Sequence, residues 1–170
     1  MARKLGLRVG IDARKIADFG IGTYIRGLLT ALVELAGDEQ YTAFAPAHVE
    51  VPAGVEHITI NAPHYSLREL VAIGLAANEE QLDVLHAPHY VTPFTRVPLV
   101  VTIHDLILLH QPLRNPLAKL YASTMIGRAV RNSARVLTVS ESVKRELVAE
   151  LRCPEQKIIV TPNGIDAPPA

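Results

Sequence analysis

Hydrophobic residues along the chain follow two patterns that alternate with one another. Short apolar runs rich in β-branched residues predict strands, and they lie at residues 7–12, 41–45, 55–60, 83–86, 98–104, 135–139 and 157–161. Between several of these runs, apolar residues repeat at the i, i+3, i+4 spacing of a helix face. Strands that alternate with helices form βαβ units. The pattern predicts an α/β fold, with a Rossmann-like open, mainly parallel sheet and helices on both faces.

Residues with strong positional preferences mark the ends of the predicted helices. The first helix follows two glycines and stops near residue 36, where Gly37 suits a left-handed C-cap. The second begins after Ser66, an N-cap that forms a capping box with Glu69. The third spans 116–133 and has a proline in its first turn. The fourth begins after Ser140, whose hydroxyl is a good N-cap.

The segment from Ala17 to Ile25 places two glycines at the start of the first helix. Gly20 and Gly22 allow a positive φ, or let the backbone lie against a ligand with no Cβ between them. A helix that starts there points N–H groups and the positive end of its dipole at the loop. This arrangement predicts an anion or phosphate site. The alternative is a glycine-containing connection that binds nothing.

Histidines gather where two predicted strands end. His86 and His89 belong to the sequence His-Ala-Pro-His-Tyr after one strand, and His104 with Asp105 follows another. Ligands of open α/β sheets bind outside the carboxyl ends of the strands. We therefore expect His104 to hydrogen-bond or protonate a substrate oxygen, and Asp105 to tune the site or bind a hydroxyl. The alternative for His104 is a structural side chain with its hydrogen bonds satisfied.

The same histidines and glycines also have partial features of metal and cofactor sites. The His-x-x-His spacing beside Asp105 offers ligands that zinc accepts, but there is no HExxH helix and no cysteine cluster. Gly20-x-Gly22 is only part of a dinucleotide fingerprint, because Ile25 stands at the third glycine position and Ala45-Pro46 replaces the ribose-binding acid. No Walker A or Gly-x-Ser-x-Gly motif is present. We expect no metal and no cofactor.

Composition limits the class of protein further. The chain has 170 residues, 49% of them apolar, a formal net charge of zero and one cysteine, Cys153. These values predict one domain with a sizeable core, no nucleic-acid partner and a reducing compartment. No apolar run is long enough for a membrane span, and the first residues lack a secretory h-region. We expect a cytoplasmic protein.

Charge is nonetheless uneven along the chain. No acidic residue lies between Asp105 and Glu141, whereas basic residues recur from Arg114 to Arg135. One interpretation is a solvated helix face. The other is attraction to an anionic membrane surface or a phosphorylated substrate, which predicts peripheral membrane contact and a lipid-linked acceptor.

Five segments, in this order and spacing, resemble the amino-terminal domain of the group 1 (family 4) glycosyltransferases, which are retaining enzymes of GT-B fold. The segments are GIGTYIRGLL at 20–29, DVLHAPHYVTP at 83–93, PLVVTIHDL at 98–106, ARVLTVSESVKREL at 134–147 and KIIVTPNGID at 157–166. Together they span almost the whole chain.

The resemblance implies two Rossmann-like domains that face each other across a cleft. The amino-terminal domain mainly holds a sugar or lipid-linked acceptor, and the other holds the nucleotide-sugar donor. His104 and Asp105 are then the catalytic residues. The implied substrate-binding residues are Gly20, Ile21, Gly22, Tyr24, His86, His89, Tyr90, Ser140, Asn163 and Gly164.

The chain departs from this family pattern because it contains no second domain and no Glu-x7-Glu motif. We therefore expect residues 1–165 to form the acceptor-side domain, and 166–170 to begin an interdomain linker. The chain alone is expected to be inactive, because it lacks the basic residues that neutralise a leaving diphosphate. Two alternatives remain: a standalone module that binds a phosphosugar or lipid phosphate, and the amino-terminal domain of another GT-B enzyme such as a sugar-nucleotide epimerase.

Overall fold

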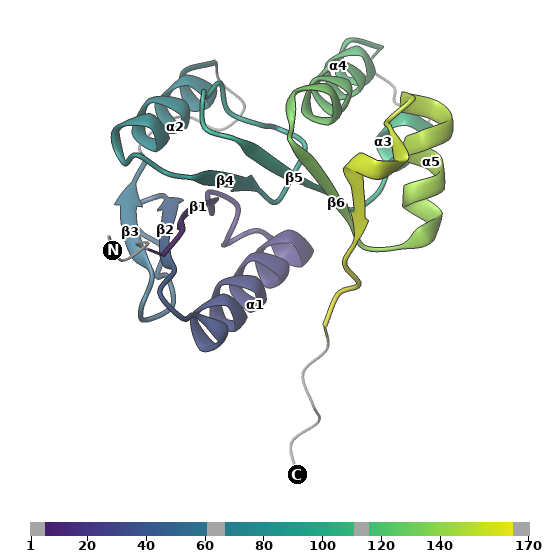
Figure 1. Ribbon diagram of the computed structural model, residues 1–170. Helices are drawn as coiled ribbons and strands as arrows, with labels where there is room; N and C mark the ends of the chain where they lie inside the picture. Colours follow the sequence, from purple (N-terminus) through teal and green to yellow (C-terminus); the bar gives the residue numbers. More distant parts are fainter. Residues whose placement is uncertain (1–5, 61–66, 111–115, 165–170) are drawn as a thin grey trace.

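A seven-stranded parallel sheet forms the centre of the protein in the computed structural model, which describes residues 6–60, 67–110 and 116–164. The strand order is β3-β2-β1-β4-β5-β6-β7, and every neighbouring pair is parallel (Figure 1). The strands are β1 (Arg8–Asp12), β2 (Gln40–Ala45), β3 (Glu56–Thr59), β4 (Val84–Ala87), β5 (Leu99–Ile103), β6 (Arg135–Thr138) and β7 (Ile158–Val160). The predicted α/β class is therefore confirmed.

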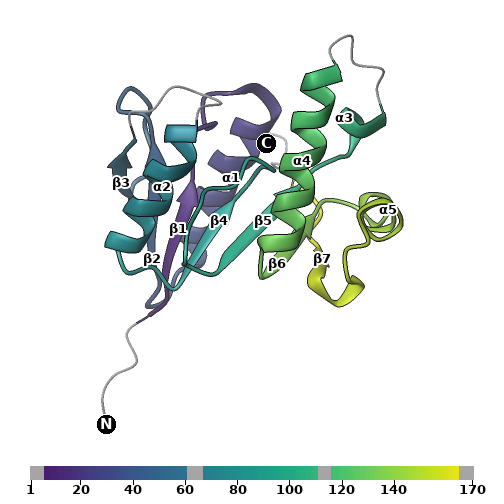
Figure 2. The same ribbon diagram turned by 90° about the horizontal axis from the view of Figure 1, so that it is seen from above.

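Helices cover both faces of the sheet, as predicted. They are α1 (Phe19–Leu35), α2 (Leu67–Glu79), α3 (Ile107–His110), α4 (Pro116–Asn132) and α5 (Glu141–Leu151), with a 3-10 turn η1 (Glu155–Lys157). Helix α1 lies on one face, and α2 and α4 lie on the other (Figures 1 and 2). Helix α5 packs against β6 and β7. Among the described helices, none combines the length and the apolar character that a membrane crossing requires.

The order of the strands determines where a ligand site can form. The chain builds β1, β2 and β3 in one direction, then returns to the other side of β1 with β4. The carboxyl ends of β1 and β4 therefore flank the point at which the order reverses, which we call the switch point. Open α/β sheets bind their ligands outside the strand ends at such a point.

The two glycines of the 17–25 segment do not form a loop, which corrects the prediction. Both lie in the first turn of α1, and of the glycines in the described part of the chain only Gly54 has a positive φ. A Cβ on Gly22 would stand 2.4 Å from the carbonyl oxygen of Ile16, whereas a Cβ on Gly20 would meet nothing within 4 Å. Gly22 is thus required by a close approach of the chain to itself.

The predicted helix caps have different outcomes. Gly37 is not a left-handed C-cap: α1 ends at Leu35, its cap Ala36 is extended, and the Glu39 carboxylate accepts a 2.8 Å hydrogen bond from the Gly37 N–H. The Ser140 hydroxyl does cap α5, accepting a hydrogen bond from the Val143 N–H at 3.3 Å. Ser66 and the side chain of Glu69 lie outside what the structure describes.

Candidate substrate-binding site

A buried cluster of ionic side chains fills the switch point. Asp12, the last residue of β1, is fully buried, and its carboxylate accepts hydrogen bonds from Nε (2.7 Å) and Nη2 of Arg14. His89 Nε2 lies 3.3 Å from Asp12 Oδ2. We call these three residues the ion cluster. Burial alone would raise the pKa of the Asp12 carboxyl, but Arg14 and His89 outweigh it and hold that pKa well below its usual range.

The ion cluster joins the loop after β1 to the loop after β4. Arg14 Nη2 also lies 3.5 Å from the Val91 carbonyl oxygen, and the Val91 N–H donates to His89 Nδ1 at 3.2 Å. Because Nδ1 accepts this bond, a proton of the ring sits on Nε2, which faces Asp12. Nε2 approaches Asp12 at 3.3 Å but makes no well-aligned hydrogen bond in the described part of the chain, so the residue is held through Nδ1 and through its charge contact with the carboxylate.

The second predicted histidine, His86, is also an interior residue. Its Nε2 lies 2.8 Å from Thr102 Oγ1, and the hydroxyl of Tyr24 lies 3.3 Å from the same oxygen. Burial, with a contribution from neighbouring His89, lowers the pKa of His86 to about 4. His86 is thus neutral at physiological pH and links β4 to β5 and α1.

His104 lies at the carboxyl edge of the sheet and is half-exposed, whereas His86 and His89 are buried. Its Nε2 lies 3.1 Å from the Pro88 carbonyl oxygen, and its ring meets the Tyr24 ring edge-on, with centroids 4.7 Å apart. A carbonyl can only accept, so Nε2 carries the proton and a neutral ring presents Nδ1 as an acceptor. Burial lowers the pKa of His104, although the Pro88 carbonyl and Asp105 oppose this shift. A neutral His104 in this tautomer accepts a hydrogen bond through Nδ1.

Asp105 is exposed and has a local structural contact. Its Oδ1 accepts a hydrogen bond from the Ile107 N–H at 3.1 Å, at the start of α3. It lies beside His104 without a hydrogen bond to its ring among the described contacts.

Two cavities are lined in part by residues of α1. The larger, of about 480 Å³, runs between α1 and the segment after β7, and brings together Gly20, Tyr24, Asn163 and Gly164 of the predicted set. The smaller, of about 110 Å³, brings together Ile21, His89, Tyr90, His104 and Asp105. Three predicted residues line neither cavity: Gly22, His86 and Ser140.

Sequence reasoning missed several polar residues of this edge. Asp12, Arg14 and Thr102 are buried and hold the histidine loops in place. Thr161 lines the larger cavity, and its hydroxyl is buried with no hydrogen-bond partner in the described part of the chain. The available signal for Asp12 and Arg14 was an acid and a base two residues apart at the end of the first predicted strand.

One basic residue of the segment from Arg114 to Arg135, Arg128, makes contacts within the fold. Arg128 donates from Nη1 to the Thr92 carbonyl at 2.6 Å and from Nη2 to the Pro93 carbonyl at 3.1 Å, and its guanidinium stacks over Phe94 at 3.9 Å. Lys119 remains exposed on α4, and Arg114 lies outside the described residues. Membrane contact through this segment stays a prediction.

Three solved structures share this fold at low sequence identity. A glycosyltransferase from Rickettsia africae matches with a TM-score of 0.57 and 17% identity, over 96% of this chain and 44% of its own. The lipopolysaccharide outer core galactosyltransferase WaaB, in its apo form, matches with a TM-score of 0.60 and 11% identity, over 93% and 46%. The UDP-GlcNAc 2-epimerase from Neisseria meningitidis, bound to UDP-GlcNAc, matches with a TM-score of 0.53 and 14% identity, over 91% and 45%.

Comparisons of the sequence itself give one match, to a family model. A search of curated proteins finds no match. The chain spans less than half the length of each of the three structural neighbours. The family model described as Glycosyltransferase Family 4 matches residues 20–167, which is most of the chain and includes both cavities. The Rossmann-like fold expected from the sequence agrees with this match, and the chain belongs to glycosyltransferase family 4.

Proposed function

We propose that this chain is the acceptor-side domain of a retaining glycosyltransferase that moves a sugar from a nucleotide-sugar to an acceptor. The observation that carries the proposal is the larger cavity, which is formed by α1 and the segment after β7. It lies at the carboxyl edge of the sheet, where ligands of such folds bind. Membership of glycosyltransferase family 4 supports sugar transfer as the reaction.

The ion cluster and Tyr24 position His104 for this role. The cluster holds the backbone around His89, and the neighbouring Pro88 carbonyl fixes the His104 tautomer. The Tyr24 ring fixes the plane of the imidazole. His104 Nδ1 then accepts a hydrogen bond from a hydroxyl of the bound sugar or acceptor, and orients that hydroxyl within the site.

The lining of the larger cavity also supports the expectation that the chain alone is inactive. Sugar transfer breaks the bond between the sugar carbon and the diphosphate, joins that carbon to the acceptor oxygen and passes the proton of the acceptor hydroxyl to the departing diphosphate, on which negative charge builds up before the proton arrives. That charge needs cationic stabilisation. The residues that line the cavity within the described chain are uncharged: Gly20, Thr23, Tyr24, Gly27, Leu28, Ala31, Thr161, Pro162, Asn163 and Gly164. A second domain that holds the donor would supply the charge.

A donor and acceptor screen tests the proposal. We expect transfer by a full-length protein that carries a second domain, and none by the 170-residue chain. His104→Ala should lower kcat/KM at least about a hundredfold if Nδ1 orients a reacting group, whereas the exposed His48→Ala should leave it unchanged. Unchanged turnover in His104→Ala removes His104 from the mechanism. Robust turnover by the 170-residue chain refutes the division of the site between two domains.

The epimerase among the structural neighbours supports one alternative function. This neighbour is a UDP-GlcNAc 2-epimerase with UDP-GlcNAc bound. An epimerase converts a nucleotide-sugar without any acceptor. Conversion of a nucleotide-sugar in the absence of acceptor, followed by NMR of the sugar protons, would favour this alternative over transfer. Binding of a phosphosugar without turnover in any full-length form would instead favour a non-catalytic module.

A further inference from the structure

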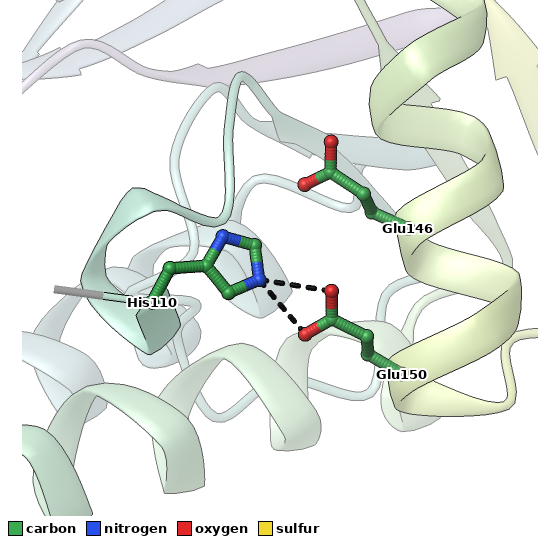
Figure 3. A group of neighbouring side chains, drawn as sticks. All are labelled: His110, Glu146 and Glu150. Atoms are coloured by element: carbon green, nitrogen blue, oxygen red, sulfur yellow. Dashed lines mark hydrogen bonds and ion pairs between the residues drawn. The ribbon is translucent and has the colours of Figure 1, made fainter.

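A separate group of metal-ligating side chains lies between α3 and α5. His110 is the last residue of α3, and Glu146 and Glu150 lie one turn apart on α5 (Figure 3). His110 Nε2 is 2.8 Å and 3.0 Å from the two carboxylate oxygens of Glu150. One ligand atom from each of the three residues lies within 4.8 Å of the others. Neither cavity of the proposed sugar site includes them.

We propose that His110, Glu146 and Glu150 bind a zinc ion. Imidazole nitrogen and carboxylate oxygen are both ligands that zinc accepts, at about 2.0–2.2 Å. Glutamates four residues apart on a helix project from the same face, and the imidazole approaches that face from a different element (Figure 3). Three protein ligands leave the fourth tetrahedral position for water.

The present geometry is close to what such a site requires. Ligand atoms around a tetrahedral zinc lie about 3.4 Å apart, which follows from the zinc–ligand distances. The 2.8 Å contact between His110 and Glu150 must widen slightly, and the other separations, which lie within 4.8 Å, must shorten by no more than about 1.4 Å. The side chains of His110 and Glu150 are 49% and 40% exposed, so they can turn without disturbing the core.

An ion pair between His110 and Glu150 does not explain why a second carboxylate, that of Glu146, lies beside them. His110 and Glu150 already pair with each other. Glu146 places a second carboxylate one turn away, and like charges at this spacing destabilise a helix. In the described part of the chain Glu146 forms no ion pair, and its hydrogen bond from the Ser142 hydroxyl is long, at 3.5 Å. A divalent cation between the three side chains removes this repulsion.

The consequence of zinc binding is local rigidity. Helix α3 has only four residues and begins two residues after Asp105. A zinc ion would join its last residue to α5, and so would fix the segment that carries His104. The zinc site depends on its own three residues, and it stands or falls independently of the proposed sugar transfer.

Zinc titration of the purified, metal-stripped protein tests this inference by isothermal titration calorimetry. We expect one zinc ion per chain and a melting temperature that rises with zinc concentration. Removal of any one ligand should weaken zinc binding by at least about tenfold, in His110→Gln, Glu146→Gln and Glu150→Gln alike. A loss of that size already follows when a residue that only hydrogen-bonds to a metal ligand is replaced. His48→Gln, which removes an exposed imidazole elsewhere, should bind as the wild type does.

Circular dichroism in a chelator keeps the test interpretable, since each variant should melt without zinc close to the wild type. No binding at near-millimolar zinc overturns the inference. Unchanged affinity in Glu146→Gln overturns it too, because Glu146 distinguishes the three-ligand site from an ion pair. Equal weakening in His48→Gln places the bound zinc elsewhere and also overturns the site.

Discussion

Replacing Asp12 by asparagine tests how far the buried ion cluster stabilises the fold. Asp12 is fully buried and Arg14 is 4% exposed, so loss of the carboxylate charge leaves a guanidinium shielded from water. Removing one partner of a buried ion pair costs about 3–5 kcal/mol. Asparagine keeps one of the two acceptor oxygens that Arg14 contacts. We therefore expect the lower end, about 3 kcal/mol, and a fall in Tm of roughly 6–12 °C.

Urea unfolding at pH 7, followed by circular dichroism, measures this loss as a lower midpoint at constant slope. Asp18→Asn is the matched control, because Asp18 forms an exposed pair with Lys15 at 3.1 Å and should cost less than about 1 kcal/mol. The double variant Asp12→Asn with Arg14→Met should regain part of the loss, since no lone charge then stays buried. A cost in Asp12→Asn no larger than that of the control refutes the reasoning.

The urea midpoint measured as a function of pH tests the same ion cluster in a second way. The folded-state pKa of Asp12 lies below the unfolded value of about 3.9, so its contribution is present above that pH and is lost as pH falls further. The folded-state pKa of His86 is lowered to about 4 from about 6.5, so its contribution is lost between those two values. The urea midpoint of Asp12→Asn should still decline between about pH 6.5 and pH 4, where His86 titrates, and should lack the further decline below pH 4 that Asp12 causes in the wild type.

Two further features can be tested by substitution. Gly22→Ala should cost about 1–3 kcal/mol, because its Cβ would clash with the Ile16 carbonyl, whereas Gly20→Ala should stabilise α1 by up to about 1 kcal/mol; equal Tm values for the two variants would contradict this. On α4, Leu117 and Leu120 are 73% and 62% exposed, so we expect sedimentation with anionic vesicles that Leu117→Glu weakens. Sedimentation that is independent of anionic lipid would discard membrane contact.

The strands could be predicted because their signal is local. Parallel strands buried on both faces need runs of apolar, β-branched residues, and such runs have few other uses in a chain of this kind. The run at 98–104 became β5 (Leu99–Ile103), and the run at 135–139 became β6 (Arg135–Thr138). Agreement to within one or two residues follows from this local origin.

The ion cluster could not be predicted because it depends on the order of the strands in space. Asp12 and His89 lie 77 residues apart in the chain and meet because β1 pairs with β4, with Ile11 beside His86. A pattern of apolar runs predicts that strands exist, but not which strand lies beside which. The histidine loops could therefore be placed at the carboxyl edge, while the partners that occupy their ring nitrogens could not.

The different roles of Gly20 and Gly22 could not be predicted from the sequence, for another reason. Gly20 and Gly22 are equivalent in sequence terms, since both suit a loop, a ligand contact or a helix start. Only the position of the Ile16 carbonyl separates them, and that position depends on how the turn after β1 folds back on α1. The requirement for glycine at one of the two positions is therefore a tertiary effect with no local signature.

The distribution of charge at the carboxyl edge bears most directly on the proposed function. The charged groups at the switch point, Asp12 and Arg14, are buried and paired with each other, so they cannot also neutralise a ligand. The larger cavity has an uncharged lining in the described chain, formed by small side chains, a tyrosine ring and backbone. Such a wall gives shape and hydrogen bonds, whereas departure of a diphosphate needs positive charge close to it. If sugar transfer is the reaction, the groups that stabilise the leaving diphosphate must face this wall from outside it.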